Sequence, residues 1–348
     1  MPENLPNIRQ TNRPNKQLLP RAMKSKGKWG LLVGFILLLT ACSPVSKIET
    51  DVLEPAEMAF PGDVYSVGYL IGEPHLEVNT RTNEIDVDAR QQFWTGLMDV
   101  ANTSPRFNPR SLRLVEPSKD SIPSDTLSWQ MVKHWTDSLD LDALAVMHRF
   151  SLYDSLKRKL VFDLGASNYY FIYQVHAQVQ WRIYDPAQRR IFHEHEYEEQ
   201  FVWESASPQE REAIRGIVDL DRAFRLSSYW SGYDIGRIMF PYWVTESRSY
   251  FSGGSRNFRN ARDYVEQNQW QNAIDLWKKS FKSNNEQLAF RAAYNIAFAL
   301  EMLGKIDQAI EWLKRAQQIQ FHNKTQEYLE ILHQRQQKLD KLDEQMPI

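Results

Sequence analysis

The chain has 348 residues, 42% hydrophobic and 25% charged, proportions typical of a globular protein long enough for two domains. Residues 1–41 hold seven of the 42 Lys and Arg residues and one of the 44 acids, so the remainder has 35 basic and 43 acidic residues and a net charge of −8. This acidic balance argues against a nucleic-acid partner, and the single cysteine, Cys42, excludes an intrachain disulfide and a Cys-based zinc site.

Residues 1–41 are predicted to be a signal peptide. Three lysines, at positions 24, 26 and 28, precede an apolar stretch over residues 30–39. This length fits a signal-peptide core and is short for a membrane span. Residues 1–22 contain four prolines and no apolar periodicity, so we expect translation to start at Met23 instead.

The residues Leu39-Thr40-Ala41-Cys42 resemble the bacterial lipobox, in which small residues precede the cleavage site and the cysteine receives the lipid. The resemblance implies that Cys42 attaches the protein to a membrane through acyl chains, each buried CH₂ contributing about 0.8 kcal/mol. By resemblance to lipoprotein sorting rules, Ser43 implies the outer membrane, with the protein facing the periplasm. The alternative is an uncleaved signal anchor.

Residues 42–52 are expected to form a polar tether, and residues 53–251 an α+β domain with helices packed against a mixed or antiparallel sheet. Its first predicted elements alternate between strands and amphipathic helices. In chain order they are a strand at 64–71, a helix from 88 to about 104, strand 111–115, helix 126–139 and strand 143–152.

A β-hairpin is the clearest predicted element. Apolar and polar residues alternate over residues 173–183 and again over 191–203, the pattern of an antiparallel pair with one solvated face. Matching the apolar faces pairs Ile183 with Ile191 and Tyr173 with Phe201, which requires a loop of three or five residues.

Two histidines, His193 and His195, fall on one face of the second hairpin strand. A His-x-His spacing can chelate a metal. The alternative is a pair of half-buried structural histidines, because the same face carries Tyr197 and Phe201 and the nearby glutamates point the other way. We therefore predict no bound metal or other cofactor, and keep the two histidines as weak metal candidates.

A helix over residues 221–239 carries Ser228, Gly232 and Gly236 four residues apart, which allows close approach of another backbone. A strand is predicted at 242–251. The Ser- and Gly-rich residues 252–256 then read as a linker.

Residues 257–348 are predicted to be all-helical, with a repeat period of 36 residues. The repeat ends in a predicted closing helix over residues 325–345. The matching positions are Ala261, Tyr264, Ala273, Trp277 and Ser280 with Ala297, Leu300, Ala309, Leu313 and Ala316. The spacing resembles the tetratricopeptide repeat, although the first repeat lacks the turn glycine. A generic pair of helical hairpins is the alternative.

In tetratricopeptide proteins the first helix of each pair lines a concave groove. Carried over by position, the resemblance gives a candidate partner-binding set of aromatic, basic and neighbouring residues, the types that anchor interfaces. The set is Phe258, Arg262, Val265, Arg291, Tyr294, Phe298 and Glu301. The alternative is that most of these side chains pack against the preceding domain.

The order of the pieces resembles an uncharacterised lipoprotein family of the Bacteroidota with C-terminal tetratricopeptide-like repeats. The resemblance rests on the lipobox, residues 53–57 (LEPAE), residues 181–186 (WRIYDP) and residues 241–251 (PYW…SRSYF). It implies architecture and location, and no activity.

Three functions follow as hypotheses. The first is a membrane-anchored, non-enzymatic adaptor that binds a protein or peptide in the cell envelope. The second is a metal-dependent hydrolase or metal-binding lipoprotein using His193 and His195. The third is a structural subunit of an outer-membrane assembly. The sequence contains no Gly-rich phosphate loop, G-x-S-x-G or H-E-x-x-H motif, and we favour the adaptor.

Overall fold

The structure is a computed structural model that describes residues 45–72, 75–77, 88–115, 126–163 and 166–346. Its described residues divide into two compact units. The first unit contains residues 53–243 and 341–346, and the second contains residues 45–52 and 244–340. The predicted signal peptide and Cys42 lie outside the described residues.

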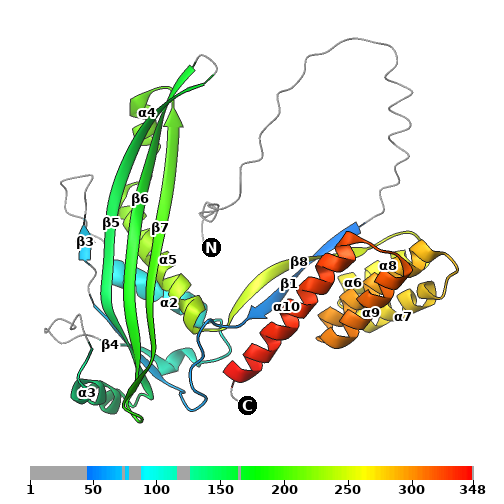
Figure 1. Ribbon diagram of the computed structural model, residues 1–348, viewed down its shortest axis with the longest axis horizontal. Helices are drawn as coiled ribbons and strands as arrows, with labels where there is room; N and C mark the ends of the chain where they lie inside the picture. The colour runs from blue at the N-terminus through cyan, green and yellow to red at the C-terminus, as the bar shows by residue number, and fades with distance from the viewer. Residues whose placement is uncertain (1–44, 73–74, 78–87, 116–125, 164–165, 347–348) are drawn as a thin grey trace. The chain divides into compact units, whose positions relative to one another are not determined.

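A six-stranded mixed sheet forms the centre of the first unit (Figure 1). Strand β2 runs parallel to β4 and β5, whereas β5, β6 and β7 are successively antiparallel, and β3 pairs with β5 off this path. The strands are β2 (Val67–Ile71), β3 (His75–Glu77), β4 (Leu112–Val115), β5 (Ala143–Asp163), β6 (Ala166–Asp185) and β7 (Arg190–Ser207). The predicted α+β class with a mixed sheet is therefore confirmed.

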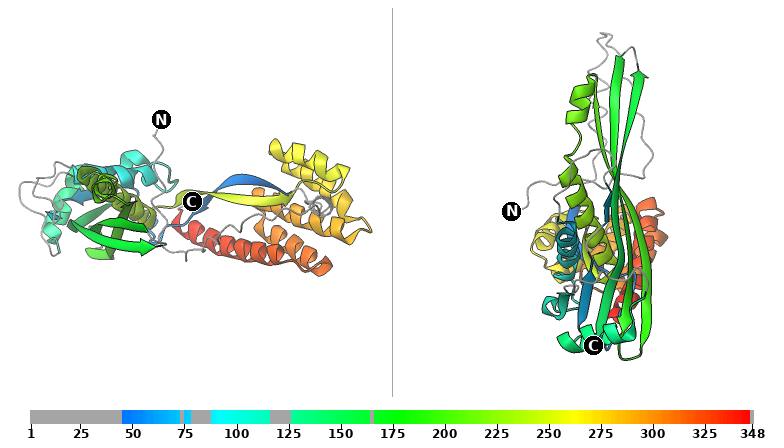
Figure 2. Two further views of the ribbon diagram at one scale, coloured as in Figure 1. Left: turned by 90° about the horizontal axis from the view of Figure 1, so that it is seen from above. Right: turned by 90° about the vertical axis from the view of Figure 1, so that its left-hand side faces the viewer.

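Helices cover both faces of this sheet. Helices α2 (Ala89–Ala101) and α5 (Leu220–Met239) lie on one face (Figures 1 and 2) and complete the larger core. Helix α3 (Trp129–Leu139) packs against the opposite face in a smaller core. A short 3₁₀ helix, η1 (Pro109–Ser111), and helix α4 (Glu210–Arg215) complete the unit.

Helices α2 and α5 approach each other closely at glycines. A Cβ atom on Gly232 would lie 1.9 Å from the carbonyl oxygen of Phe93, and one on Gly96 would lie 1.9 Å from the carbonyl oxygen of Tyr229. No side chain fits at these distances, so both positions require glycine. The close approach predicted along residues 221–239 is confirmed, and α2 is its partner.

The predicted register of the hairpin is wrong. In the structure Tyr173 pairs with Trp203 and Val175 with Phe201, and the loop between β6 and β7 has four residues, 186–189. A β-bulge between Ile183 and Tyr184 shifts the register, because β7 contains one residue more than β6 there. The extra residue is Phe192, an apolar residue directly after Ile191 that interrupts the alternation of apolar and polar residues along this strand.

Strand β5 extends eleven residues beyond the predicted end at Leu152, to Asp163. Its distal half pairs with β6 throughout, from Tyr153 opposite His176 to Asp163 opposite Ala166. Three consecutive basic residues, 157–159, mask the apolar alternation of this half, which explains why the sequence pattern failed to predict it.

The second unit begins with a two-stranded ribbon of β1 (Val45–Glu54) and β8 (Tyr242–Phe251). Residues 42–52 were expected to be a tether, but from Val45 onward they form β1. The strand is polar because only every second residue, such as Ile48 and Val52, faces the interior. The predicted strand at residues 242–251 is confirmed as β8.

Five helices follow, in antiparallel succession: α6 (Arg256–Glu266), α7 (Trp270–Phe281), α8 (Glu286–Met302), α9 (Ile306–Ile319) and α10 (Asn323–Gln345). Equivalent positions of the 36-residue period are buried alike, including Ala261 with Ala297 and Trp277 with Leu313. The period therefore corresponds to two helical hairpins that share one core. Strand β8 contributes Tyr250 to that core, so most of β8 belongs with the helices rather than with the preceding domain.

Candidate functional site

The inner face of the helical unit is filled by the chain's own strand β8. Of the seven predicted partner-binding residues, five are buried: Phe258, Val265, Tyr294, Phe298 and Glu301. Only the two arginines, Arg262 and Arg291, remain partly or largely exposed. These five side chains are closed to a partner and pack within the helical unit, so neither the predicted groove nor the alternative of packing against the preceding domain describes them.

Aromatic contacts hold β8 on helix α8. The ring of Tyr250 stacks on Phe298 with centroids 5.2 Å apart and planes 5° apart. The ring of Phe251 meets Tyr294 edge-on, with centroids 5.3 Å apart. Such pairs are worth about 0.5–1.5 kcal/mol each beyond the burial of their area.

The side-chain amide of Asn295 captures the backbone of β8. Its Oδ1 accepts a hydrogen bond from the backbone N–H of Phe251 at 2.9 Å, and its Nδ2 donates to the carbonyl oxygen of Phe251 at 2.7 Å. Asn295 is fully buried. A neighbouring β-strand would form the same pair of hydrogen bonds with the extended backbone of Phe251. The contact between α8 and β8 therefore resembles the binding of an extended peptide.

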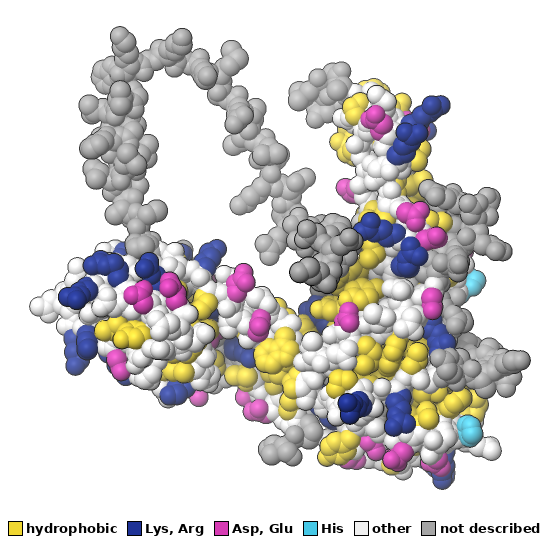
Figure 3. Space-filling view, turned by 180° about the vertical axis from the view of Figure 1, so that it is seen from behind, with side chains coloured by type: hydrophobic (Ala, Val, Ile, Leu, Met, Phe, Trp, Pro, Cys, Tyr) yellow, Lys and Arg dark blue, Asp and Glu magenta, His cyan; other side chains and the backbone are white. Residues whose placement is uncertain are grey.

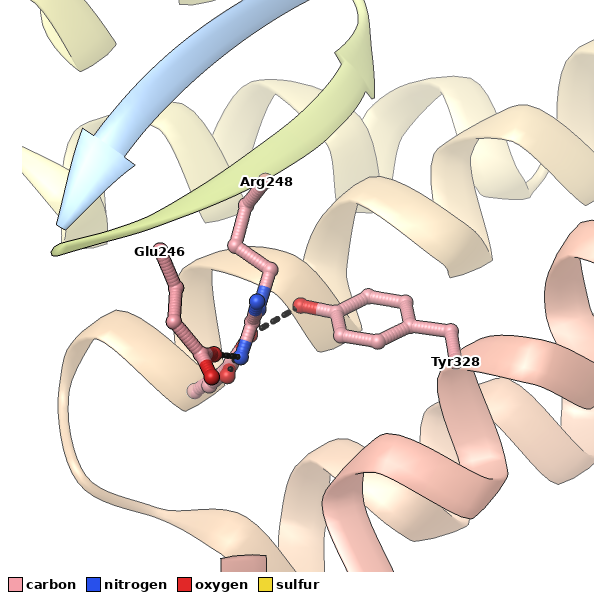
Figure 4. A network of polar contacts seen from close by, with 4 residues as sticks. Glu246, Arg248 and Tyr328 are labelled. Carbon is pink, nitrogen blue, oxygen red and sulfur yellow. Dashed lines mark hydrogen bonds and ion pairs between the residues drawn. The ribbon is translucent and has the colours of Figure 1, made fainter. Parts of the chain in front are cut away.

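A buried network of polar and charged side chains also connects β8 to α8 and α10 (Figure 4). Nε of Arg248 donates to both carboxylate oxygens of Glu301, at 3.0 and 3.2 Å, and its NH2 donates to Glu246. The hydroxyl of Tyr328 on α10 donates to Glu301 as well. Four side chains from β8, α8 and α10 thus satisfy one another.

The pKa shifts in the network favour the protonation states that its hydrogen bonds require. Burial, followed by the charge of Glu301, raises the pKa of Tyr328, so its hydroxyl stays a donor. Burial opposes the charge of Arg248, but Glu301 and Glu246 outweigh it and raise the pKa of the guanidinium. An ion pair that is buried together with its hydrogen-bond partners fixes the positions of β8, α8 and α10. Its charged groups are compensated by one another and are not available for a chemical reaction.

Arg248, Asn295 and Tyr328 were not among the predicted site residues. Arg248 carried a usable signal, because it shares one face of a predicted strand with Tyr250 and Glu246, two residues away on each side. A charged residue at an inward position of a strand needs a partner. Asn295 and Tyr328 carried no such signal, since nothing local links them to β8.

The two candidate metal ligands lie side by side in the first unit. The rings of His193 and His195 are stacked, with centroids 6.1 Å apart, and Trp181 lies 5.1 Å from His193. Nε2 of His193 is buried, and within the described part of the chain it neither donates nor accepts a hydrogen bond. Burial, followed by the charge of His195, lowers the pKa of His193. Among the described residues no group of three or more His, Cys, Asp or Glu side chains is arranged to hold a metal ion.

Exposed apolar side chains gather on the distal half of the β5–β6 hairpin. Phe162 is 77% exposed, and Leu156, Leu160 and Tyr170 are about 40% exposed. Leu156, Leu160 and Phe162 alternate along β5 and therefore share one face. Along this half, β5 pairs with β6 on one side, and no described strand pairs with its other side beyond Tyr153. Tyr170 pairs with Lys159 and therefore points to the other face of the sheet, so we call Leu156, Leu160 and Phe162 the hairpin patch.

Within the described part of the chain, no helix has the length and apolarity needed to cross a membrane.

Two family models match the sequence. A domain of unknown function, DUF8603, matches residues 78–251, which is half of the chain. A second domain of unknown function, DUF6340, matches residues 259–334. A search of curated proteins found no match.

Several solved structures show weak similarity. A homolog of neuraminyllactose-binding hemagglutinin from Helicobacter pylori is 12% identical, with 62% of this chain and 98% of that chain covered and a TM-score of 0.30. The PelC dodecamer of Paraburkholderia phytofirmans is 6% identical, with coverage of 56% and 98% and a TM-score of 0.26. A minor lipoprotein of Acinetobacter baumannii is 10% identical, with coverage of 50% and 86% and a TM-score of 0.16. At these TM-scores the similarities carry no argument about function.

Proposed function

The chain belongs to the family described as domain of unknown function DUF8603, and we propose that it is a lipid-anchored, non-enzymatic adaptor of the bacterial cell envelope. In this proposal Cys42 carries the acyl chains, the protein faces the periplasm from the outer membrane, and the body binds a protein or peptide. The helical hairpins of the second unit are the proposed tetratricopeptide-like repeats.

The hairpin patch is the observation that carries the adaptor proposal. Exposed apolar side chains that cluster on one element mark interaction surfaces in soluble proteins. Strand β8 already occupies the inner face of the helices. We therefore assign partner binding to the hairpin patch instead of the helices. No described strand pairs with the outer edge of β5 beyond Tyr153, and an extended partner segment would add there as a further strand.

A comparison of co-purified partners tests the hairpin patch. The test variant is Leu160→Ser with Phe162→Ser, and the control is Met131→Ser with Leu303→Ser, two exposed apolar residues elsewhere. We expect the test variant to lose a partner that wild type and control retain. Identical partner sets for all three proteins would reject the patch. Substitutions of Phe298 or Tyr294 cannot test binding, because both residues belong to the core.

The anchor has its own test. Cys42→Ala should leave a chain that is not acylated and is not processed at this position, detected as a change of mass and by loss of acyl labelling. A Cys42→Ala protein with the same mass and labelling as wild type would contradict the anchor and leave the hairpin result standing.

The other hypotheses remain distinguishable. A structural subunit of an outer-membrane assembly would co-purify in fixed stoichiometry and would be unstable without its partners. Stoichiometric metal in the purified protein, lost in His193→Phe, would favour a metal-dependent activity instead.

A further inference from the structure

One end of the second unit gathers the termini of several helices. The amide of Asn257, near the start of α6, donates to Ser280 near the end of α7 at 3.2 Å. The ring of Phe290, near the start of α8, stacks on His322 between α9 and α10 at 5.6 Å. The start of α6, the end of α7, the start of α8 and the α9–α10 turn therefore lie together.

The ribbon ends at this same place. The guanidinium of Arg291, on the second turn of α8, lies 5.4 Å from the ring of Phe251, the last residue of β8. Strands β1 and β8 pair, and Asp51 accepts a hydrogen bond from Thr245, so the start of β1 lies beside the end of β8. The described chain thus enters the second unit, at Val45, among these helix ends.

This end of the unit is strongly basic. We define the basic pole by six exposed side chains that form no ion pair with another described residue: Arg256, Arg259, Lys278, Lys279, Lys282 and Lys324. Figure 3 shows Lys and Arg side chains in dark blue over the upper left of the molecule, where this unit lies. Two exposed acids, Glu286 and Glu327, lie in the same region, so the local charge is positive although the body as a whole is acidic.

An exposed aromatic ring accompanies the charges. Phe321, in the turn between α9 and α10, is 71% exposed and directly precedes His322, which stacks on Phe290. Basic side chains around an exposed aromatic ring are the combination that adsorbs to the interface of an anionic bilayer, with the ring entering the headgroup region.

We propose that the basic pole and Phe321 bind the surface of an anionic phospholipid bilayer. The inference rests on the proposed anchoring at Cys42. Two residues, Ser43 and Pro44, separate Cys42 from Val45, and the three Cα–Cα steps between them span at most about 10 Å. Electrostatic interactions persist over about 8 Å at physiological ionic strength. A lipid on Cys42 therefore keeps the pole within reach of headgroup phosphates, and the pole fixes which end of the second unit faces the membrane.

Vesicle binding of the non-acylated protein tests the pole directly. The mature chain from residue 42 carries Cys42→Ser, so that no acyl chain contributes. We expect it to co-sediment with vesicles containing 30% phosphatidylglycerol and to remain soluble with pure phosphatidylcholine vesicles. Each Lys or Arg near such a surface raises affinity about fivefold, so Arg256→Glu, Arg259→Glu and Lys282→Glu together should reduce binding at least 100-fold.

A charge-matched variant separates the pole from overall charge. Arg211→Glu, Arg222→Glu and Arg225→Glu change the same number of exposed arginine or lysine side chains in the first unit. We expect this control to bind within about threefold of the parent, since these charges lie outside the pole. Phe321→Ser should weaken binding less than the pole variant does and leave its salt dependence unchanged.

Three outcomes would overturn the proposal: no binding to anionic vesicles, equal binding to both kinds of vesicle, or equal losses in the pole variant and the control. None of them bears on acylation at Cys42, which the mass and labelling of the Cys42→Ala protein decide separately.

Discussion

Both units bury polar groups beside a strand, but the second unit buries a charged network around Arg248, whereas the first unit buries neutral ring nitrogens beside β6 and β7. In the second unit Arg248, Glu301 and Tyr328 satisfy one another across three elements. In the first unit the ring nitrogens Nε2 of His193 and Nε1 of Trp181 are buried without a hydrogen bond. The difference follows from charge, because a buried ion needs a partner, whereas a neutral imidazole or indole nitrogen can remain unpaired at moderate cost.

The network around Arg248 and the pair His193 and His195 have different roles. The ionic network specifies where β8 lies on the helices, because any other placement would leave a charge buried alone. The histidine pair carries no buried charge that would determine where a strand lies. The lowered pKa of His193 instead makes the stability of the first unit depend on pH. Substitutions at Glu301, Gly232 and His193 test these roles, with expected changes in stability that decrease in that order.

Breaking the ionic network should have the largest effect. Glu301→Leu leaves Arg248 without its main buried partner and should lower the free energy of unfolding of the second unit by about 3–5 kcal/mol. Urea unfolding, followed by the fluorescence of Trp277 in the core of that unit, measures the change. Replacing the pair, with Arg248→Met added, should recover most of the loss.

An exposed ion pair of the same unit provides the control. Lys314 and Glu311 lie 3.1 Å apart on the surface of α9. Glu311→Ala should change stability by less than about 0.5 kcal/mol, because solvent screens the pair. Equal losses for Glu301→Leu and Glu311→Ala would show that burial of the network adds nothing.

The contact between α2 and α5 should respond to a single methyl group. Gly232→Ala places a Cβ atom 1.9 Å from the carbonyl oxygen of Phe93, so the helices must separate. We expect the first unit to lose about 1–3 kcal/mol, measured as a lower urea midpoint for unfolding. Gly62→Ala, where the added Cβ meets nothing within 4 Å, should leave the midpoint unchanged or raise it slightly.

The smallest effect concerns pH. Burial and His195 lower the pKa of His193 below its usual value of 6.5, so the unfolded chain takes up a proton more readily than the folded chain. The contribution of His193 to stability is therefore complete above pH 6.5 and declines as the pH falls below it. His193→Phe should reduce the loss of thermal stability between pH 7.5 and pH 5.5.

An exposed histidine is the matched control for this titration. His75→Phe should reproduce the wild-type dependence of the melting temperature on pH, since its side chain lies in solvent. If His193→Phe also follows the wild-type curve, His193 does not contribute to the pH dependence of stability in this range. Burial lowers the pKa of His176 too, so part of the pH dependence should persist in His193→Phe.

The local patterns predicted most of the elements and failed where residues far apart meet. Helix α5 lies within one residue of its predicted start and ends at the predicted residue, because Asp219 caps its first turn and Pro241 follows its end. The hairpin register failed because one extra residue in β7 changes the pairing without changing the alternation on either side. The candidate groove failed because the sequence gives the helical period but does not say what fills the space inside it.

The α+β class, the glycine contact and the 36-residue period could be predicted from the sequence, since each depends on residue types within a short span or at a fixed spacing. Only the folded structure shows that β8 fills the inner face of the helices, that Glu301 bonds both Arg248 and Tyr328, and that basic side chains from three helices and a turn share one pole. The pairings of Glu301 join residues 53 and 27 positions apart in the sequence. Shape complementarity and the cost of burying an unpaired charge select such pairings, and neither appears in a local pattern.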